Sequence, residues 1–217
     1  MSHHKARNSR LASAKGSKPM PRHRLLAILA GLLAVLLAGG LILRSGVMDN
    51  APPPSLVGGP FQLVDQNGKP TTEATLKGQW NAVFFGFTYC PDVCPGTLQA
   101  LAAASDQLGP RAKDLKIVFI SVDPGRDTPE QVKAFLSGDN LPKNVQGLTG
   151  APGQVAAAAK AYRVYYKAVG DGPGYSVDHS TAVYLMDPKG RFVKVIPYNL
   201  PPEEIARQIR DAMEGRR

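Results

Sequence analysis

Residues 80–98 read WNAVFFGFTYCPDVCPGTL, and the fold is best understood by working outward from this stretch. Its first ten residues, 80–89, are rich in β-branched and aromatic side chains and have the length of a buried strand. An apolar pattern suited to a helix follows over 95–108, and its leading proline is tolerated in a first helical turn. Cys90 and Cys94 therefore fall together at one predicted strand-to-helix junction.

The strand and helix patterns continue on both sides of this junction. Upstream, FQLV at 61–64 leads into DQNG at 65–68, which is a strong hairpin signal. Downstream, the sequence predicts a buried strand over 115–122, a helix that starts at 127–130 and continues to 136, and an Ala-rich helix over 151–167. Two strands over 181–186 and 191–196, with a turn between them, and a final helix over 201–213 follow. This order predicts an α/β fold with a central mixed sheet flanked by helices, in which a late hairpin forms an antiparallel edge.

An uncharged apolar run of nineteen residues lies at 25–43. As a helix it spans about 28 Å, close to the roughly 30 Å hydrocarbon core of a bilayer. The apolar region of a cleaved signal peptide is usually shorter, about 7–15 residues, so the run predicts one uncleaved transmembrane helix. Residues 1–24 hold seven Lys or Arg and no acid. This charge predicts a cytoplasmic tail, with residues 45–217 on the opposite side of the membrane.

The excess of basic over acidic residues lies almost entirely in that tail, and the rest of the chain is nearly neutral, so the formal net charge of +9 does not indicate nucleic-acid binding. Three consecutive prolines and no apolar periodicity mark 44–57 as an extended linker. The predicted organisation is therefore a basic tail (1–24), a transmembrane helix (25–43), a Pro-rich linker (44–57) and one globular domain (58–217).

The chemistry of this chain is predicted to reside in its two cysteines. A disulfide between Cys90 and Cys94 would close a very small loop and stabilise the fold little. The positive end of a helix favours thiolates, so we expect a lowered pKa at both sulfurs. Three residues separate the cysteines, whereas a dithiol redox motif usually has two, and paired thiolates suit Cu(I) and, less exclusively, zinc. Two inert buried cysteines are the plain structural alternative.

His179 is the only histidine in the predicted globular domain, since His3, His4 and His23 lie in the tail. A histidine just before a strand is more often structural, but no other imidazole of the chain could join the cysteines. Two thiolates and one imidazole would form a three-coordinate site for Cu(I), or for Cu(II) with an added oxygen.

Two aspartates are candidate outer partners of this site. Asp123 follows the predicted strand over 115–122, and Asp178 precedes His179. Either could support the histidine as a hydrogen-bond partner or weak ligand, or could simply cap a turn. Arg126 is expected to pair with Asp127 or an exposed acid.

Three segments of the chain resemble the Sco/SenC family of copper chaperones for cytochrome c oxidase assembly. They are FFGFTYCPDVCPGTL (84–98), SVDPGRDTPEQVKAF (121–135) and DHSTAVYLMDPKGRF (178–192). The resemblance implies a thioredoxin-like fold and copper bound by two cysteines and a histidine, here Cys90, Cys94 and His179. It also implies delivery of copper to the binuclear copper centre of the oxidase's second subunit, or reduction of the cysteines of that centre. Tyr89 stands where the family often has histidine.

These observations predict a metallochaperone first and an enzyme second. The enzyme reading is a thiol–disulfide oxidoreductase using Cys90 and Cys94, and a thiol peroxidase is a weaker third reading of residues 87–90. Other copper donors or thiol reductants are the further expected partners. A bacterial inner membrane with the domain in the periplasm is the expected location, and the mitochondrial inner membrane is the alternative.

Overall fold

The computed structural model describes residues 21–44, 56–139, 141–142 and 144–216. The chain forms two compact units, Met1–Pro52 and Pro53–Arg217. The first contains α1 (Arg22–Arg44), which coincides with the apolar run. Among the described residues, no helix is both long enough and apolar enough to cross a membrane, so the predicted transmembrane helix is not confirmed. Most of the predicted tail and linker lies outside the described residues.

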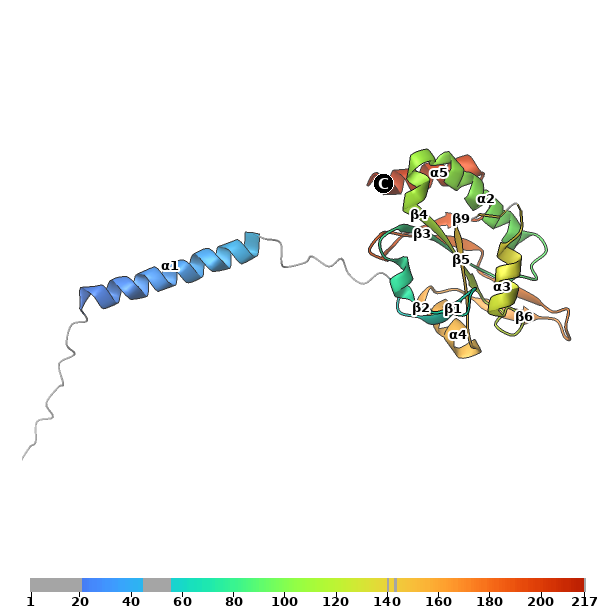
Figure 1. Cartoon of the computed structure of the whole chain (residues 1–217), viewed down its shortest axis with the longest axis horizontal. Helices are drawn as coiled ribbons and strands as arrows, with labels where there is room; N and C mark the ends of the chain where they lie inside the picture. The colour runs from blue at the N-terminus through green and yellow to red at the C-terminus, as the bar shows by residue number, and fades with distance from the viewer. Residues whose placement is uncertain (1–20, 45–55, 140, 143, 217) are drawn as a thin grey trace, which may run out of the picture. The chain divides into compact units, whose positions relative to one another are not determined.

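The second unit is built on a seven-stranded mixed sheet in the order β2-β1-β5-β4-β3-β8-β9 (Figure 1). Its strands are β1 (Gln62–Asp65), β2 (Pro70–Thr72), β3 (Trp80–Gly86), β4 (Leu115–Ser121), β5 (Val145–Thr149), β8 (Ala182–Met186) and β9 (Phe192–Pro197). The central strands β3, β4 and β5 run parallel, and the β1–β2 and β8–β9 hairpins are antiparallel. This arrangement agrees with the predicted α/β fold and its antiparallel edge.

Helices cover the sheet, with α2 and α5 packed against each other on one side and α4 on the opposite side (Figure 1). The helices of this unit are α2 (Val93–Gln107), α3 (Pro129–Leu136), α4 (Pro152–Ala161) and α5 (Pro202–Met213), with the short 3₁₀ helices η1 (Glu73–Leu76) and η2 (Gly109–Asp114). The helix α3 packs on β5, where the absence of a side chain at Gly147 leaves room for Val132 and Leu136.

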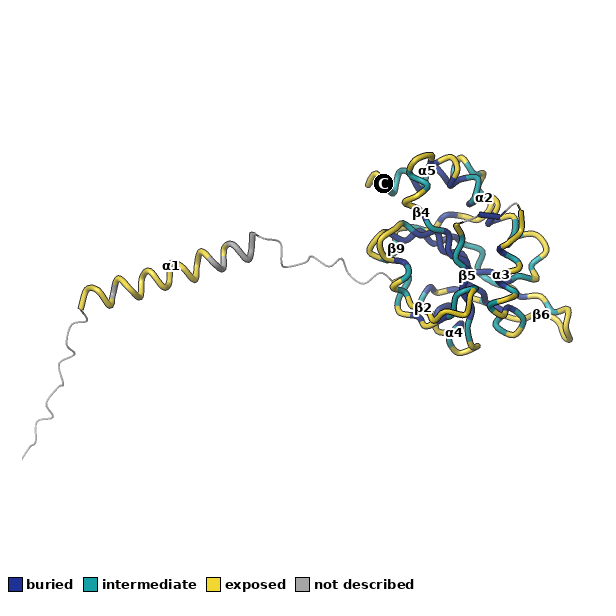
Figure 2. The backbone as a smooth tube through the Cα atoms, viewed as in Figure 1, coloured by how far each residue is buried: buried dark blue, intermediate teal, exposed yellow. Residues whose placement is uncertain are grey.

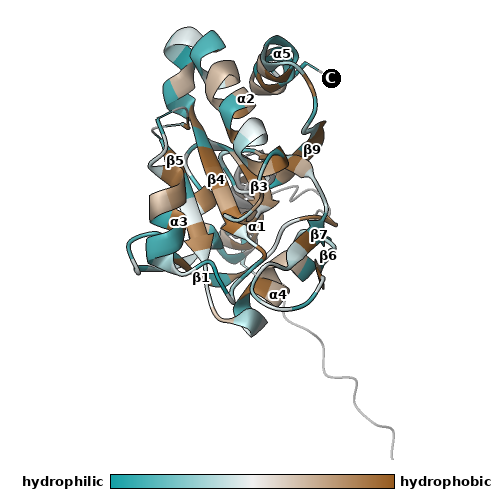
Figure 3. Cartoon of the chain, turned by 90° about the vertical axis from the view of Figure 1, so that its right-hand side faces the viewer, coloured by the Kyte–Doolittle hydropathy of each residue, from teal (hydrophilic) through white to brown (hydrophobic). Residues whose placement is uncertain are grey.

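The core is formed by the central strands and the inner faces of these helices. Residues 82–87 and 117–122 of the β3 and β4 segments are all buried, as Figure 2 shows for the middle of the sheet. Much of β3 and β4 is hydrophobic, as their brown colour in Figure 3 shows. A strand buried on both faces reads as a continuous apolar run, which is why the sequence revealed β3 and β4 so clearly.

The chain between α4 and β8 differs from the prediction. The helix expected over 151–167 ends at Ala161, because Arg163 adopts a left-handed conformation with φ 56°. The following residues form β6 (Tyr166–Val169) and β7 (Ser176–His179), a separate two-stranded antiparallel sheet. Neither strand was predicted, and their pairing places His179 opposite Tyr166.

Candidate metal centre

Cys90 and Cys94 lie where β3 passes into α2, as predicted, but the helix begins two residues earlier than expected. It starts at Val93, so Cys94 is in its first turn and is completely buried. Cys90 lies in the preceding loop and is partly exposed. Its Sγ accepts a hydrogen bond from the Cys94 main-chain nitrogen at 3.4 Å. Both residues are free thiols, so the junction presents two sulfurs of unequal accessibility.

His179, the last residue of β7, faces the buried thiol across 85 residues of sequence. Its Nε2 is 3.8 Å from Cys94 Sγ. The other ring nitrogen, Nδ1, is 3.0 Å from the Ser180 main-chain oxygen, which only accepts hydrogen bonds, so the proton belongs on Nδ1. Phe87 and Phe84 hold the ring from its sides, with centroids at 5.9 and 6.3 Å. This leaves the Nε2 lone pair directed at the thiol.

The expected lowering of both thiol pKa values is wrong for Cys94. Burial raises the pKa of the Cys94 thiol far above its ordinary value, and a hydrogen bond involving the Phe87 main chain offsets this only in part. Burial also lowers the pKa of His179, against the smaller effect of its hydrogen bond to Ser180. Both groups are therefore neutral at pH 7. A neutral thiol and a neutral imidazole can be buried together without a counterion.

The side chains of Cys90, Cys94 and His179 do not all converge on one point. In the described ranges, no group of three or more His, Cys, Asp or Glu side chains is close enough together to hold a metal ion. The Cys94–His179 pair is nevertheless formed, and Cys90 precedes Cys94 by four residues in the chain. Two sulfurs and an imidazole nitrogen form a donor set that suits a soft ion such as Cu(I).

The two candidate aspartates do not hydrogen-bond to His179. Asp123 is buried and accepts hydrogen bonds from Arg126 Nε at 2.6 Å and from the Tyr175 hydroxyl. Asp178 is exposed and lies opposite Lys167 in the β6–β7 ladder. The ring of His179 is oriented instead by a main-chain oxygen.

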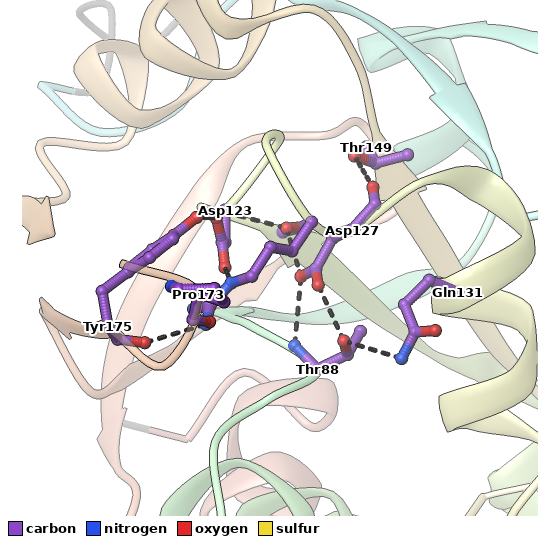
Figure 4. A network of polar contacts seen from close by, with 9 residues as sticks. Thr88, Asp123, Asp127, Gln131, Thr149, Pro173 and Tyr175 are labelled. Carbon is purple, nitrogen blue, oxygen red and sulfur yellow. Dashed lines mark hydrogen bonds and ion pairs between the residues drawn. The ribbon is translucent and has the colours of Figure 1, made fainter. Parts of the chain in front are cut away.

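The sequence predicts Asp127 as part of a helix start, but its side chain bonds to the loop that follows β3 and carries Cys90. The residue is 1% exposed and accepts hydrogen bonds from the Thr88 nitrogen at 3.0 Å, the Thr88 hydroxyl at 2.7 Å and the Ser121 hydroxyl at 2.6 Å (Figure 4). Burial raises its pKa, and these hydrogen bonds oppose that shift. Thr128 caps the N-terminus of α3, because its side-chain hydroxyl accepts a hydrogen bond from the Gln131 main-chain nitrogen.

Sequence similarity to known proteins points to one family. The family model described as SCO1/SenC matches residues 49–214. The mitochondrial protein SCO1 homolog 1 of Arabidopsis thaliana is 47% identical over 140 residues, and protein SenC of Rhodobacter capsulatus is 44% identical over 151 residues. These alignments cover 64% and 69% of this chain, and 41% and 67% of the two relatives, so much of the Arabidopsis protein has no counterpart here.

Solved structures show the same fold. The structure of Bradyrhizobium japonicum ScoI with copper bound is 44% identical, with a TM-score of 0.65 over 71% of this chain and 98% of that one. BsSco, a member of the Sco family of cytochrome c oxidase assembly proteins in which a disulfide switch was identified, is 28% identical, with a TM-score of 0.58 over 74% and 95%. The match over three quarters of the sequence, the thioredoxin-like α/β fold and the thiol–imidazole pair lead to one conclusion: this chain belongs to the SCO1/SenC family.

Proposed function

We propose that this chain binds one copper ion through Cys90, Cys94 and His179 and delivers it to the binuclear copper centre of cytochrome c oxidase. The observation that carries the proposal is the approach of Cys94 Sγ to His179 Nε2 at 3.8 Å. Copper in the related ScoI structure supports the choice of metal. The assembly role attributed to BsSco supports the choice of recipient.

Binding requires a rotation of the Cys90 side chain and the loss of thiol protons. Cys94 and His179 already face each other, so a metal between them lacks only a third ligand. Cys90 is in a loop and partly exposed, which allows its sulfur to turn from the Cys94 nitrogen toward the metal. Two thiolates and a neutral imidazole leave the Cu(I) shell with about one negative charge, and the Cu(II) shell neutral.

Release proceeds by ligand exchange with thiols of the recipient. Each incoming thiol loses a proton as its sulfur binds copper, and each departing cysteine gains one. Burial raises the pKa of Cys94, so its thiolate takes up a proton readily once copper leaves. The exposed side of the site at Cys90 provides the approach for the recipient's thiols.

The ligand set is tested on the reduced full-length chain with a competing Cu(I) chelator. We expect one tightly bound copper, and an affinity loss of at least about tenfold in each of Cys90→Ala, Cys94→Ala and His179→Ala, because each variant removes one of three ligands. Copper K-edge absorption should report two sulfur neighbours and one nitrogen. Unchanged affinity in His179→Ala would remove the histidine from the ligand set.

A thiol–disulfide oxidoreductase is the second candidate, favoured by the disulfide switch described for BsSco. Both cysteines are free and adjacent to one helix start, so they could form a disulfide while reducing the cysteines of the recipient. This activity needs no imidazole ligand. Disulfide reduction that survives in His179→Ala while copper binding fails would favour it over the chaperone role.

The placement at a membrane is also proposed from the sequence. The apolar run at 25–43 would anchor the chain, with residues 1–24 on the cytoplasmic side and the copper-binding domain, 58–217, in the periplasm of a bacterium. The mitochondrial inner membrane is the alternative, and the Arabidopsis relative is named as a mitochondrial protein. Protease accessibility of tagged chains in sealed vesicles tests the orientation.

A further inference from the structure

Arg126 lies in the loop between β4 and α3, and its guanidinium joins segments that are distant in the sequence. Its Nε donates to Asp123 at 2.6 Å, which corrects the expected pairing with Asp127 or an exposed acid. Its Nη1 donates to the main-chain oxygens of Tyr175 at 2.8 Å and Pro173 at 3.3 Å, in the turn between β6 and β7. Figure 4 shows this turn drawn up beside Asp123.

Aromatic rings enclose the same guanidinium. Its central carbon lies 3.6 Å from the ring centroid of Tyr175 and 4.7 Å from that of Tyr89, with Phe87 at 6.0 Å. Phe87 and Tyr89 belong to the loop that carries Cys90 and leads into α2, whereas Tyr175 belongs to the hairpin that carries His179. Arginine stacks on aromatic faces and donates in several directions, so one side chain holds both loops. We call Arg126, Asp123, Tyr89 and Tyr175 the Arg126 clasp.

The hairpin needs such support because it is not part of the main sheet. In the described part of the chain, β6 and β7 pair with each other in a sheet of two strands, separate from the sheet of seven. A two-stranded hairpin is only marginally stable by itself, so its position depends on side-chain contacts with the rest of the domain. Tyr175 immediately precedes β7, and His179 ends that short strand.

We propose that the Arg126 clasp positions His179 against Cys94, so that Arg126 is a positioning residue for copper binding. The inference rests on the proposed copper site, for which it names a further determinant outside the ligands. The guanidinium fixes the position of Tyr175. His179 lies four residues later, at the end of β7, so fixing Tyr175 also helps to fix the imidazole beside the Cys94 thiol. Asp123 acts through the same clasp, since its carboxylate orients the guanidinium and accepts a hydrogen bond from the Tyr175 hydroxyl.

A purely electrostatic role makes a different prediction from a mechanical one. If the positive charge of Arg126 mattered by itself, Arg126→Lys would retain copper affinity. A lysine ammonium cannot stack on two rings while donating to two main-chain oxygens and a carboxylate. The clasp therefore predicts that Arg126→Lys weakens copper binding almost as much as Arg126→Ala.

The test compares Cu(I) affinities of the reduced full-length chain and its variants by chelator competition. We expect a loss of at least about fivefold in Arg126→Ala, a similar loss in Tyr175→Ala and little recovery in Arg126→Lys. In a His179→Ala background, Arg126→Ala should have almost no further effect, because the residue that it positions is already absent. Arg111→Ala is the matched control, since Arg111 pairs with Glu214 at the end of α5, and its affinity should stay that of the parent.

A second measurement needs no copper. Hydrogen exchange of the amides of β7 in the apo chain should accelerate in Arg126→Ala and in Tyr175→Ala, while the amides of β3 keep their protection. Parent affinity and parent exchange in both variants would overturn the clasp. Full affinity in His179→Ala would overturn the proposed ligand set instead, and the exchange of β7 would still decide whether the clasp holds the hairpin.

Discussion

The Cys94 thiol lies in the first turn of α2 with no exposed surface, and two opposing influences act on its proton. A helix N-terminus stabilises a nearby anion by about 0.3–1 kcal/mol, which is less than one pKa unit. Burial away from water disfavours the anion by as much as 3–5 units. The second effect is larger, so the thiol stays protonated beside a neutral imidazole, and copper must displace that proton to bind.

Copper affinity should therefore depend on pH. Between about pH 6.5 and 8, each unit of acidification should weaken binding at least about tenfold, because the Cys94 thiol, whose pKa is raised, must lose one proton. The pKa of His179 is lowered, so its imidazole stays neutral in this range and adds no proton of its own. Chelator competition at several pH values, corrected for protonation of the chelator, measures the slope.

The matched variant for this measurement is Cys94→Ala. Its slope should be smaller by the one proton that Cys94 releases. An affinity independent of pH in the parent chain would contradict the requirement for thiol deprotonation.

The contact between β3 and α2 depends on a residue without a side chain. A Cβ at Gly86 would lie 2.8 Å from Cys94 Sγ and 2.9 Å from the Phe119 ring. Both distances are shorter than a Cβ atom normally makes with a neighbouring heavy atom. Gly86 thus allows the first turn of α2, with its thiol, to sit directly on the end of the strand. The β6–β7 hairpin then brings the imidazole to the same point, so the site is assembled by two contacts between elements.

Gly86→Ala should destabilise the domain by about 1–3 kcal/mol, the usual cost of overpacking, and should weaken copper binding because Cys94 Sγ is displaced. Denaturant unfolding and copper competition on the same protein measure the two effects. Gly96→Ala is the control within the same helix, since Gly96 is exposed and a Cβ there meets nothing within 4 Å. It should stabilise the fold by about 0.5–1 kcal/mol. Parent stability in Gly86→Ala would show that the junction is looser than described.

The whole domain carries its own core. Every buried hydrophobic residue among those described lies between Phe61 and Ile209, inside the unit Pro53–Arg217. The sheet, its covering helices and the candidate metal centre all belong to this unit.

Removal of residues 1–52 should therefore leave the domain folded, with the midpoint of thermal unfolding and the copper stoichiometry of the full chain. Differential scanning calorimetry and metal analysis of the shortened and full chains test this. A lower unfolding temperature in the shortened chain would show that the amino-terminal unit contributes to domain stability. The variant Cys94→Ala in the shortened chain serves as the control for copper bound outside the site.

The sequence by itself determined the central strands β3 and β4, the helices that flank them, the β1–β2 and β8–β9 hairpins, and the place of both cysteines at one junction. The third central strand, β5, was not predicted. These features are local: continuous apolar runs, turn residues and a proline near a helix start act over neighbouring residues. The tertiary structure decided the rest. The β6–β7 strands form by pairing with each other rather than by their own pattern, and the pKa of Cys94 follows from burial. Arg126 finds its partners 47 and 49 residues away. Such long-range contacts exist only after the chain has folded, so no local sequence pattern predicts them.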